Sequence, residues 1–239
     1  TREEQDIYAN ISHQRPYKAQ EEGKFKEEII PLLIGLKRNK LLWTDIGPRR
    51  NSSVEGLGKL RPYFEKKSGT VTVGNSCPVT DGGSLCLLAS EEAVNKFNLK
   101  PMAKIVDYHF QGLGPERMGM GPLVAIDGLL KRTKLELDQI DLFEINEAFA
   151  AQILSVLKGF EDDNISRQYG LDKARGPIPR DKLNVNGGGI ALGHPVGSSG
   201  SRIVVSLAHE LKKRKGKYGL ASLCVGGGQG GALLIENIQ

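Results

Sequence analysis

The order of apolar segments after residue 100 constrains this chain more than any other feature. Short apolar segments typical of strands alternate there with longer segments of helical periodicity, and two strands follow one another at the end. This alternation predicts a layered α/β domain in which helices cover a mixed, five-stranded sheet. The glycines between the last two strands predict an antiparallel hairpin. The five strands are predicted at residues 103–106, 140–145, 183–185, 220–225 and 232–235.

Three helices are predicted between these strands. Residues 121–133 and 147–158 have helical periodicity. A third helix is expected to start at a cap formed by Ser198 or Ser199. Its apolar residues recur at positions i, i+4 and i+8, which places them on one buried face. The residues of that face are Ile203, Leu207 and Leu211.

The first hundred residues are more polar and have weaker patterns. The Thr1-x-x-Glu4 sequence is a capping box, which predicts a helix over residues 1–22 with a kink at Pro16. Residues 70–73 alternate as a strand does. Residues 81–95 are predicted to be a helix. Little in the segment before residue 66 indicates a core of its own.

Composition excludes several classes of protein. The chain has 239 residues, of which 39% are hydrophobic, as in globular proteins. Three cysteines without a C-x-x-C pair favour a reducing compartment over a disulfide framework or a zinc site. No run of about 18 apolar residues occurs, so no membrane span is expected. The first residue is Thr1, and no signal peptide is visible, so we expect a fragment or a trimmed product.

The net charge of +5 gives little indication of nucleic-acid binding. Its densest basic run, residues 212–215, fits the last turn of a helix, where cations are favoured. Aromatic residues that would stack on bases are not interleaved with it. A mild basic excess suits a phosphorylated small molecule, so we expect a small-molecule ligand rather than a nucleic acid.

Two glycine-rich blocks each contain a residue able to transfer a proton. Residues 187–197 include His194, between a strand and a helix, where sites of α/β proteins collect. Residues 223–230 include Cys224, which is followed by three glycines. Either residue could be structural, as a histidine or a buried thiol commonly is. Alternatively, the glycines let a ligand approach the backbone, and the Gly226 N–H could face an oxyanion.

Two further patterns have competing interpretations. Gly226, Gly228 and Gly231 spell G-x-G-x-x-G, but a strand follows them rather than a helix, which argues against a dinucleotide site. Asn146 lies where a strand gives way to a helix. It is either an N-cap or a group that holds a water beside a carbonyl oxygen.

Taken together, these motifs resemble the thiolase family. The resemblance covers essentially all 239 residues, and the order of the motifs and the spacing from His194 to Cys224 fit. The motifs that carry it are Asn146-Glu147-Ala148-Phe149, Gly193-His194-Pro195, Cys224-Val225-Gly226, Gly74-Asn75 with Asp81-Gly82, Met118-Gly119 with Gly121-Pro122, and residues 57–62.

The resemblance implies catalytic roles. His194 would activate a nucleophilic cysteine in the N-terminal domain. With a water held by Asn146, it would also stabilise the enolate oxygen of a thioester. Cys224 would carry the proton to and from the α-carbon, and the Gly226 N–H would join a second oxyanion hole. Carbon–carbon bond formation next to a thioester needs such an acid–base residue and such donors.

The resemblance also implies a site for coenzyme A, which would be a substrate; no other cofactor and no metal is implied. Arg49 or Arg50 would meet the nucleotide end, and Leu60 and Phe149 would pack against the ligand. Cys77 stands where the family often has a serine near the pantetheine.

One departure from the family is central. The family's nucleophilic cysteine lies upstream of the part that this chain resembles, and neither Cys77 nor Cys86 has its context. The N-terminal domain is therefore expected to be incomplete. We predict the latter part of the CoA-covering loop domain over 1–66, the last strand and helix of the N-terminal domain over 67–100, and the C-terminal domain over 101–239. Apolar faces such as those of 203–211 and 220–225 would then be uncovered.

The predicted function is that of an acyl-CoA C-acyltransferase, which reversibly cleaves a 3-ketoacyl-CoA or condenses two acyl-CoAs. This chain alone is expected to be inactive. The alternative is a catalytically incomplete CoA-binding or assembly module. The complete form is expected to be a homo-oligomer in the cytoplasm, or in the mitochondrial matrix or peroxisome of a eukaryote.

Overall fold

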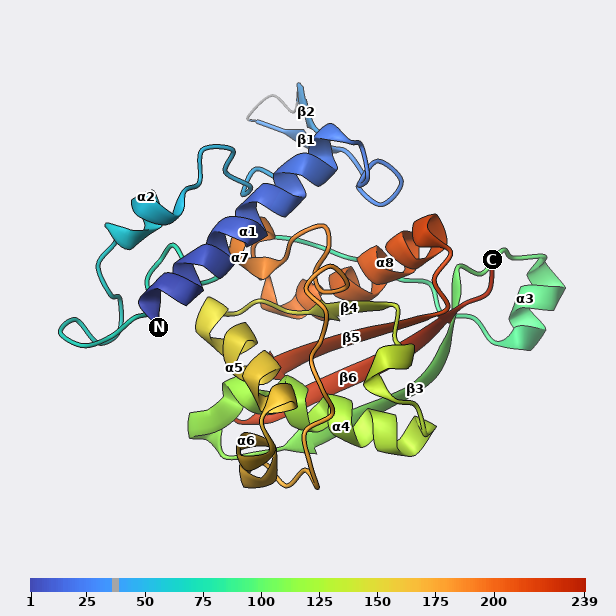
Figure 1. Ribbon diagram of the computed structural model, residues 1–239. Helices are drawn as coiled ribbons and strands as arrows, with labels where there is room; N and C mark the ends of the chain where they lie inside the picture. The colour runs from blue at the N-terminus through green and yellow to red at the C-terminus, as the bar shows by residue number, and fades with distance from the viewer. Residues whose placement is uncertain (36–38) are drawn as a thin grey trace. The chain divides into compact units, whose positions relative to one another are not determined.

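The computed structural model describes residues 1–35 and 39–239 (Figure 1). Contacts divide the chain into two compact units. Unit 1 combines Thr1–Asp81 with two short downstream segments, Glu147–Ala151 and Val185–His194. Unit 2 holds the rest of the described chain, Gly82–Asn146, Gln152–Asn184 and Pro195–Gln239. The first unit therefore contains Glu147–Phe149 and His194, which belong to motifs far downstream in the sequence, whereas Asn146 is in unit 2.

Unit 2 is built on a mixed sheet, as predicted. Its strand order is β3-β6-β5-β4. Strand β6 lies between β3 and β5 and is antiparallel to both, whereas β4 is parallel to β5. The expected hairpin is confirmed, because β5 and β6 pair directly across the glycine turn. The strands are β3 (Ala103–Gly112), β4 (Leu142–Ile145), β5 (Tyr218–Val225) and β6 (Gln229–Asn237).

The predicted fifth strand, residues 183–185, is reduced to a single bridge between Leu183 and Phe143. Among the described residues, the sheet thus has four strands rather than five. The cause is Asn184, whose backbone adopts a left-handed conformation with φ of 45°. Its side chain then takes over the pairing with the neighbouring strand, as a short amide readily does.

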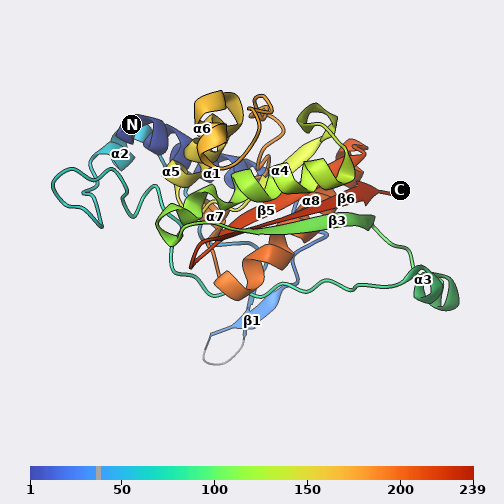
Figure 2. The same ribbon diagram turned by 90° about the horizontal axis from the view of Figure 1, so that it is seen from below.

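Helices cover both faces of this sheet (Figure 2). Helix α4 (Gly121–Thr133) packs on β3 and β6, and α8 (Val196–Arg214) packs on β5 and β4 from the opposite face. In α8 the predicted face is buried, with Ile203, Leu207 and Leu211 at most 1% exposed. Further helical elements of this region are α3 (Glu91–Phe97), η1 (Pro115–Met120), η2 (Leu137–Gln139), α5 (Ala150–Glu161) and α6 (Asp163–Gln168).

The expectation that the faces of 203–211 and 220–225 would be uncovered is wrong. Helices and strands within unit 2 already bury them, and Leu220 is fully buried. Exposed apolar side chains of unit 2 lie instead on residues 85–97, on β3 and at Val196, the first residue of α8. Leu85 is 86% exposed and Phe110 is 67% exposed.

The predicted helix over 81–95 is also largely wrong. Only α3 (Glu91–Phe97) is helical, and its N-cap Ser90 accepts a hydrogen bond from the Ala93 N–H. Residues 85–89 are a continuous apolar run rather than a one-sided stripe, so a helix there would have no polar face.

Unit 1 is organised around α1 (Arg2–Glu21). The capping box between Thr1 and Glu4 is confirmed, and the helix continues across Pro16. The other elements are the antiparallel pair β1 (Leu32–Ile34) and β2 (Lys40–Leu42), helix α2 (Val54–Gly58) and the single-turn α7 (Gly189–Leu192).

The predicted strand over 70–73 is wrong, because side chains turn the backbone there. The Thr72 N–H donates to Asn75 Oδ1 and the Gly74 N–H donates to Thr72 Oγ1. Asn75 also donates to Asp6 on α1, which ties the turn to that helix. Such local side-chain bonds offer the backbone an alternative to a sheet.

Candidate active site

Asn146 and Cys224 lie at the same end of the sheet in unit 2. Strands β4 and β5 are parallel, with Ile145 opposite Ser222. The Asn146 N–H extends this ladder by donating to the Ser222 carbonyl at 2.9 Å. Cys224 comes two residues later on β5 and is buried. The carboxyl ends of parallel strands are where α/β proteins place ligands, so the structure brings these two predicted residues together at such an end.

The side-chain amide of Asn146 is the most informative group at this position. The residue is 1% exposed, and neither its Nδ2 nor its Oδ1 has a hydrogen-bond partner among the described residues. The N-cap interpretation is therefore wrong. Burying an amide without partners costs about 1–3 kcal/mol for each unsatisfied group. The amide is thus poised to bind a water or a ligand, which was the alternative interpretation.

The glycines after Cys224 have different surroundings. A side chain added at Gly226 would meet nothing within 4 Å, so the backbone is open to an approaching molecule there. Gly228 has φ of 91° and is pressed against the Leu113 carbonyl and Pro115. Gly226 is thus accessible to a ligand, whereas Gly228 is required by the turn and by packing.

In unit 1, the glycine-rich block before His194 is enclosed by protein. A Cβ at Gly187 would overlap Pro16, and one at Gly188 would overlap Glu147. Gly193 has φ of 94°, and a Cβ there would lie 2.5 Å from Thr80. These glycines allow chain segments to pack closely on the turn. His194 follows directly and is half-buried.

The helix after His194 is not capped as predicted. Pro195 occupies the N-cap position of α8 without a side-chain cap bond, and Ser198 and Ser199 lie inside the first turn. Ser199 Oγ instead donates to the Pro195 carbonyl at 3.1 Å. The helix therefore begins at Val196, earlier than a serine cap would place its start.

Glu147 belongs to a motif named above, but the sequence assigned it no role. It is 1% exposed, and its carboxylate accepts hydrogen bonds from Tyr8, Ser12 and the Ile190 N–H. The two side-chain donors are 139 and 135 residues away in the chain. Only its place beside Asn146 in the motif could have drawn attention to it.

Cys77 and Phe149 are brought together in unit 1. The Cys77 N–H donates to the Ala148 carbonyl at 3.0 Å, and Ser76 forms a bridge with Phe149. The Phe149 ring meets Phe64 edge to face, with centroids 6.2 Å apart. Burial raises the pKa of the Cys77 thiol above its ordinary value, and its own backbone offsets this only in part. The thiol is therefore protonated at neutral pH and is a poor nucleophile.

The other residues predicted to bind CoA lie along unit 1. The Arg49 N–H donates to His13 Nδ1 at 3.3 Å, and the exposed Arg50 guanidinium lies 5.8 Å from the Tyr17 ring centroid. Leu60 instead packs against the backbone of Gly74. Burial, reinforced by the charge of Arg49, lowers the pKa of His13 to about 4. His13 is thus a neutral acceptor at pH 7.

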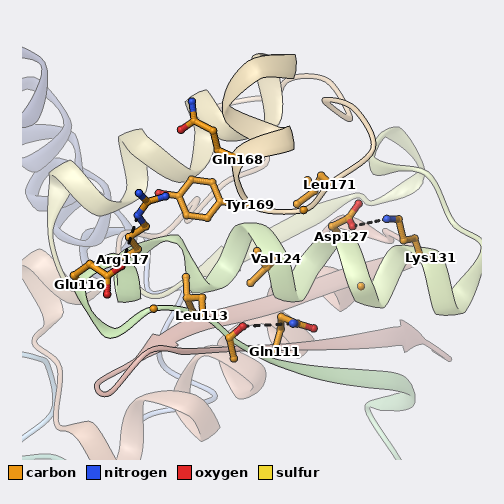
Figure 3. Close-up of a pocket in the computed structure, with 14 residues that line it drawn as sticks. Gln111, Leu113, Glu116, Arg117, Val124, Asp127, Lys131, Gln168, Tyr169 and Leu171 are labelled. Carbon is orange, nitrogen blue, oxygen red and sulfur yellow. Dashed lines mark hydrogen bonds and ion pairs between the residues drawn. The ribbon is translucent and has the colours of Figure 1, made fainter.

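A separate cavity of about 570 Å³ opens in unit 2 (Figure 3). The Arg117 guanidinium lies over the Tyr169 ring, and Lys131 pairs with Asp127 at 3.1 Å. Arg175 contacts the same carboxylate at 2.6 Å and holds the loop after α6 against α4. The residues that line this cavity do not include Asn146, Cys224 or Gly226.

Within residues 1–35 and 39–239, no helix is long and apolar enough to cross a membrane. The same ranges contain no group of three or more His, Cys, Asp or Glu side chains that could hold a metal ion.

Comparison with known proteins gives matches along the whole chain. The thiolase N-terminal domain profile matches residues 1–92, and the thiolase C-terminal domain profile matches residues 99–237. The mitochondrial 3-ketoacyl-CoA thiolase of Bos taurus is 46% identical over 238 residues, which is 99% of this chain. An acetyl-CoA acetyltransferase of Syntrophomonas wolfei is 44% identical over 238 residues.

Solved structures agree with these matches. A crystal structure of the Bacillus anthracis acetyl-CoA acetyltransferase is 44% identical and superposes with a TM-score of 0.89. A human mitochondrial 3-ketoacyl-CoA thiolase in complex with CoA is 42% identical, with a TM-score of 0.84. Each covers all of this chain, whereas the chain spans only 56% and 55% of theirs. The same holds for the curated relatives, of which it spans 56%. With profiles of both domains matched and close relatives along its whole length, the chain belongs to the thiolase family.

Proposed function

We propose that this chain supplies the enolate-forming half of an acyl-CoA C-acyltransferase. The observation that carries the proposal is the Asn146 amide, which is buried without protein partners beside the strand that bears Cys224. Folding alone does not favour such an amide, because its desolvation is not offset. A thioester enolate requires polar groups of this kind, held ready for its oxygen.

Each motif residue then has a chemical role. The Cys224 thiolate removes a proton from the α-carbon of an acyl-CoA, and the electron pair moves onto the thioester oxygen as an enolate. A water held by Asn146, together with His194, donates hydrogen bonds to that oxygen. The α-carbon then attacks an acyl group held on a nucleophile as a thioester, and the Gly226 N–H donates to the second oxyanion. The nucleophile leaves as a thiolate, which His194 reprotonates, and the product is a 3-ketoacyl-CoA.

Coenzyme A is proposed as the carrier of both acyl groups. A related solved structure contains CoA. Arg49 and Arg50, both exposed on unit 1, suit its phosphates, because arginine matches phosphate geometry. Cys77 and Phe149, together on one short stretch, are proposed to meet the pantetheine, and Leu60 to pack nearby. The proposal extends to a homo-oligomer in a reducing compartment, the cytoplasm, in keeping with three free cysteines.

The experiment follows the exchange of acetyl-CoA α-protons with deuterated water by NMR. Asn146→Ala should lower the exchange rate by roughly 10²–10³-fold, the usual effect of losing one oxyanion donor. Its melting temperature should not fall, because no protein hydrogen bond is lost. Ser166→Ala is the control, since that buried hydroxyl is bonded to the Gly159 carbonyl elsewhere in unit 2 and its loss should lower stability instead. Exchange at the wild-type rate in Asn146→Ala would refute the proposal.

A second candidate function is CoA binding without turnover. It is favoured by the raised pKa of Cys77 and by the location of Cys86 on an exposed segment, because neither thiol is placed as a nucleophile. Saturable CoA binding by the chain together with undetectable α-proton exchange would select this function over the first.

A further inference from the structure

The carboxylate of Glu147 joins three segments of unit 1 that are far apart in the sequence. Tyr8 donates to Oε1 at 2.9 Å, and Ser12 donates to Oε2 at 2.5 Å. The Ile190 N–H also donates to Oε2, at 3.3 Å. The first two donors are on α1, whereas Ile190 is in the single-turn helix α7.

The chemistry of these contacts fits a carboxylate better than any other side chain. An ionised glutamate only accepts hydrogen bonds, and donors converge here on both of its oxygens. Glu147 is 1% exposed, so its desolvation must be offset by such bonds. A Cβ at Gly188 would overlap the Glu147 side chain, so the glycine is what lets the turn approach the carboxylate.

Fixing Ile190 also fixes the path of the backbone into His194. Helix α7 has one turn, in which the Leu192 N–H donates to Gly188 and the Gly193 N–H donates to Gly189. Gly193 then turns the chain with φ of 94°, packed against Thr80, and His194 is the next residue. The turn has few bonds of its own, so a hydrogen bond to its second residue restrains most of it.

We propose that Glu147 is the positioning residue for His194. It locks the 187–193 turn against α1, and this holds the imidazole in the orientation that the acyl-transfer reaction requires. The inference rests on the proposed function for the role of His194, but the position of the turn is measurable without turnover.

Tyr8 and Ser12 contribute to the same positioning, because their hydroxyls hold the Glu147 carboxylate from α1. The residue next to Ser12 is His13, which accepts the Arg49 N–H. Helix α1 therefore connects the loop proposed to meet CoA with the turn that leads to His194. Loss of the Ser12 hydroxyl should loosen the turn even though Ser12 lies outside it.

The test compares Ser12→Ala and Glu147→Gln with a matched control, Ser166→Ala. Ser12 and Ser166 are both at most 1% exposed, and each donates its hydroxyl to one acceptor. Ser166 lies in unit 2, on α6, and bonds the Gly159 carbonyl. Both serine variants should lose similar stability, but only Ser12→Ala should affect the 187–193 turn.

Two NMR signals of the whole chain report on the turn. Hydrogen exchange of the Ile190 amide should accelerate about tenfold in Ser12→Ala and more in Glu147→Ala, against less than about twofold in Ser166→Ala. The imidazole C–H signal of His194 is assigned by its loss in His194→Gln. This signal should shift in Ser12→Ala and in Glu147→Ala, and it should not shift in Ser166→Ala. Glu147→Gln keeps one acceptor oxygen and should give intermediate values.

A kinetic measurement distinguishes failure of this inference from failure of the proposed function. Glu147→Gln should lower the acetyl-CoA α-proton exchange rate at saturation about tenfold or more, with less than about twofold change in KM. If the wild-type chain shows no exchange while the NMR signals respond as expected, the proposed function fails and the structural part of the inference stands. Unchanged Ile190 and His194 signals in Ser12→Ala and Glu147→Gln would overturn the inference whatever the activity.

Discussion

The side chain of Asn184 pairs with both backbone groups of Ile145. The Ile145 N–H donates to Asn184 Oδ1, and Asn184 Nδ2 donates to the Ile145 carbonyl, each at 2.8 Å. Ile145 is the last residue of β4, and Asn146 follows it. One amide thus completes the sheet at the point where the chain presents the candidate site residue.

Asn184→Ala should therefore destabilise the protein by about 2–4 kcal/mol, because it leaves two buried backbone groups unpaired. It also places alanine at a left-handed φ of 45°. Asn98→Ala separates the two effects, since Asn98 is exposed and has φ of 50° at the end of α3. It should cost about 1 kcal/mol. Urea denaturation of both variants measures the difference, and equal losses would contradict the role of the Ile145 bonds.

The 239-residue chain should have no thiolysis activity. Acyl transfer needs a thiolate nucleophile, whereas burial raises the pKa of Cys77 and keeps that thiol protonated. Cleavage of acetoacetyl-CoA by the purified chain is the measurement. Turnover in the ordinary enzymatic range, roughly 1–1000 per second, would show that a cysteine within this chain is the nucleophile. Cys77→Ser and Cys86→Ser would then test two of the three cysteines, and turnover retained in both variants would leave Cys224 as the nucleophile.

Cys77 and Cys86 should differ in reactivity toward iodoacetamide. Cys77 is half-buried, with a raised pKa, whereas Cys86 lies exposed on the segment before α3. At pH 7.5, Cys86 should be alkylated at least about tenfold faster, because the thiolate is the reacting form and access is needed. Peptide mass spectrometry of time points gives both rates. Faster modification of Cys77 would mean that its thiol is activated, contrary to the structure.

His13 should make the stability of the fold depend on pH. Its pKa is lowered to about 4 by burial and by Arg49, whereas an unfolded histidine titrates near 6.5. The neutral form is favoured in the folded protein, so this contribution is complete above about pH 6.5. It is lost as the pH falls toward 4, by at most about 1.4 kcal/mol per pH unit.

His13→Asn tests this dependence, because its amide oxygen can still accept the Arg49 N–H but does not titrate. The difference in unfolding free energy between the wild type and the variant should shrink as the pH is lowered from 7 to 4. A difference that stays constant over this range would show that His13 is not held neutral.

Features with local signals were predictable from the sequence. The capping box of α1 involves residues three apart, and the apolar face of α8 repeats every four residues, so both are visible in a short window. The β5–β6 hairpin is likewise indicated by the glycines between the two strands. At the candidate site, Asn146 and Gly226 each directly follow a strand and Cys224 is the penultimate residue of one, which is why the sequence points to these three residues.

What could not be predicted depends on partners that are distant in the chain or on single side chains. The donors to Glu147 lie 135 and 139 residues away, and no local pattern marks them. Thr72 and Asn75 convert an apparent strand into a turn, and Asn184 ends another after one bridge. In each case a polar side chain competes with the sheet for backbone hydrogen bonds. The periodicity of apolar residues gives no sign of this competition.

Arg49 and Arg50 should contribute to CoA affinity. Both are exposed; Arg49 is connected through its N–H to His13, and Arg50 lies over Tyr17. Each guanidinium is thus near α1 but retains donors for phosphate. Charge-assisted bonds of this kind contribute about 1.5–3 kcal/mol. Arg49→Ala or Arg50→Ala should weaken CoA binding by roughly tenfold or more if the arginine replaced contacts a phosphate. Calorimetry measures the affinity.

Two controls make this last prediction specific. Arg132→Ala removes the same charge from an exposed arginine in unit 2 that pairs with Asp107, so it should leave CoA affinity within about twofold. Pantetheine lacks the nucleotide phosphates and should bind the wild type and all three variants alike. If Arg49→Ala and Arg50→Ala both bind CoA as the wild type does, the nucleotide end of CoA is held elsewhere. If they weaken pantetheine equally, the arginines act through the fold of unit 1, because a phosphate contact cannot affect a ligand without phosphates.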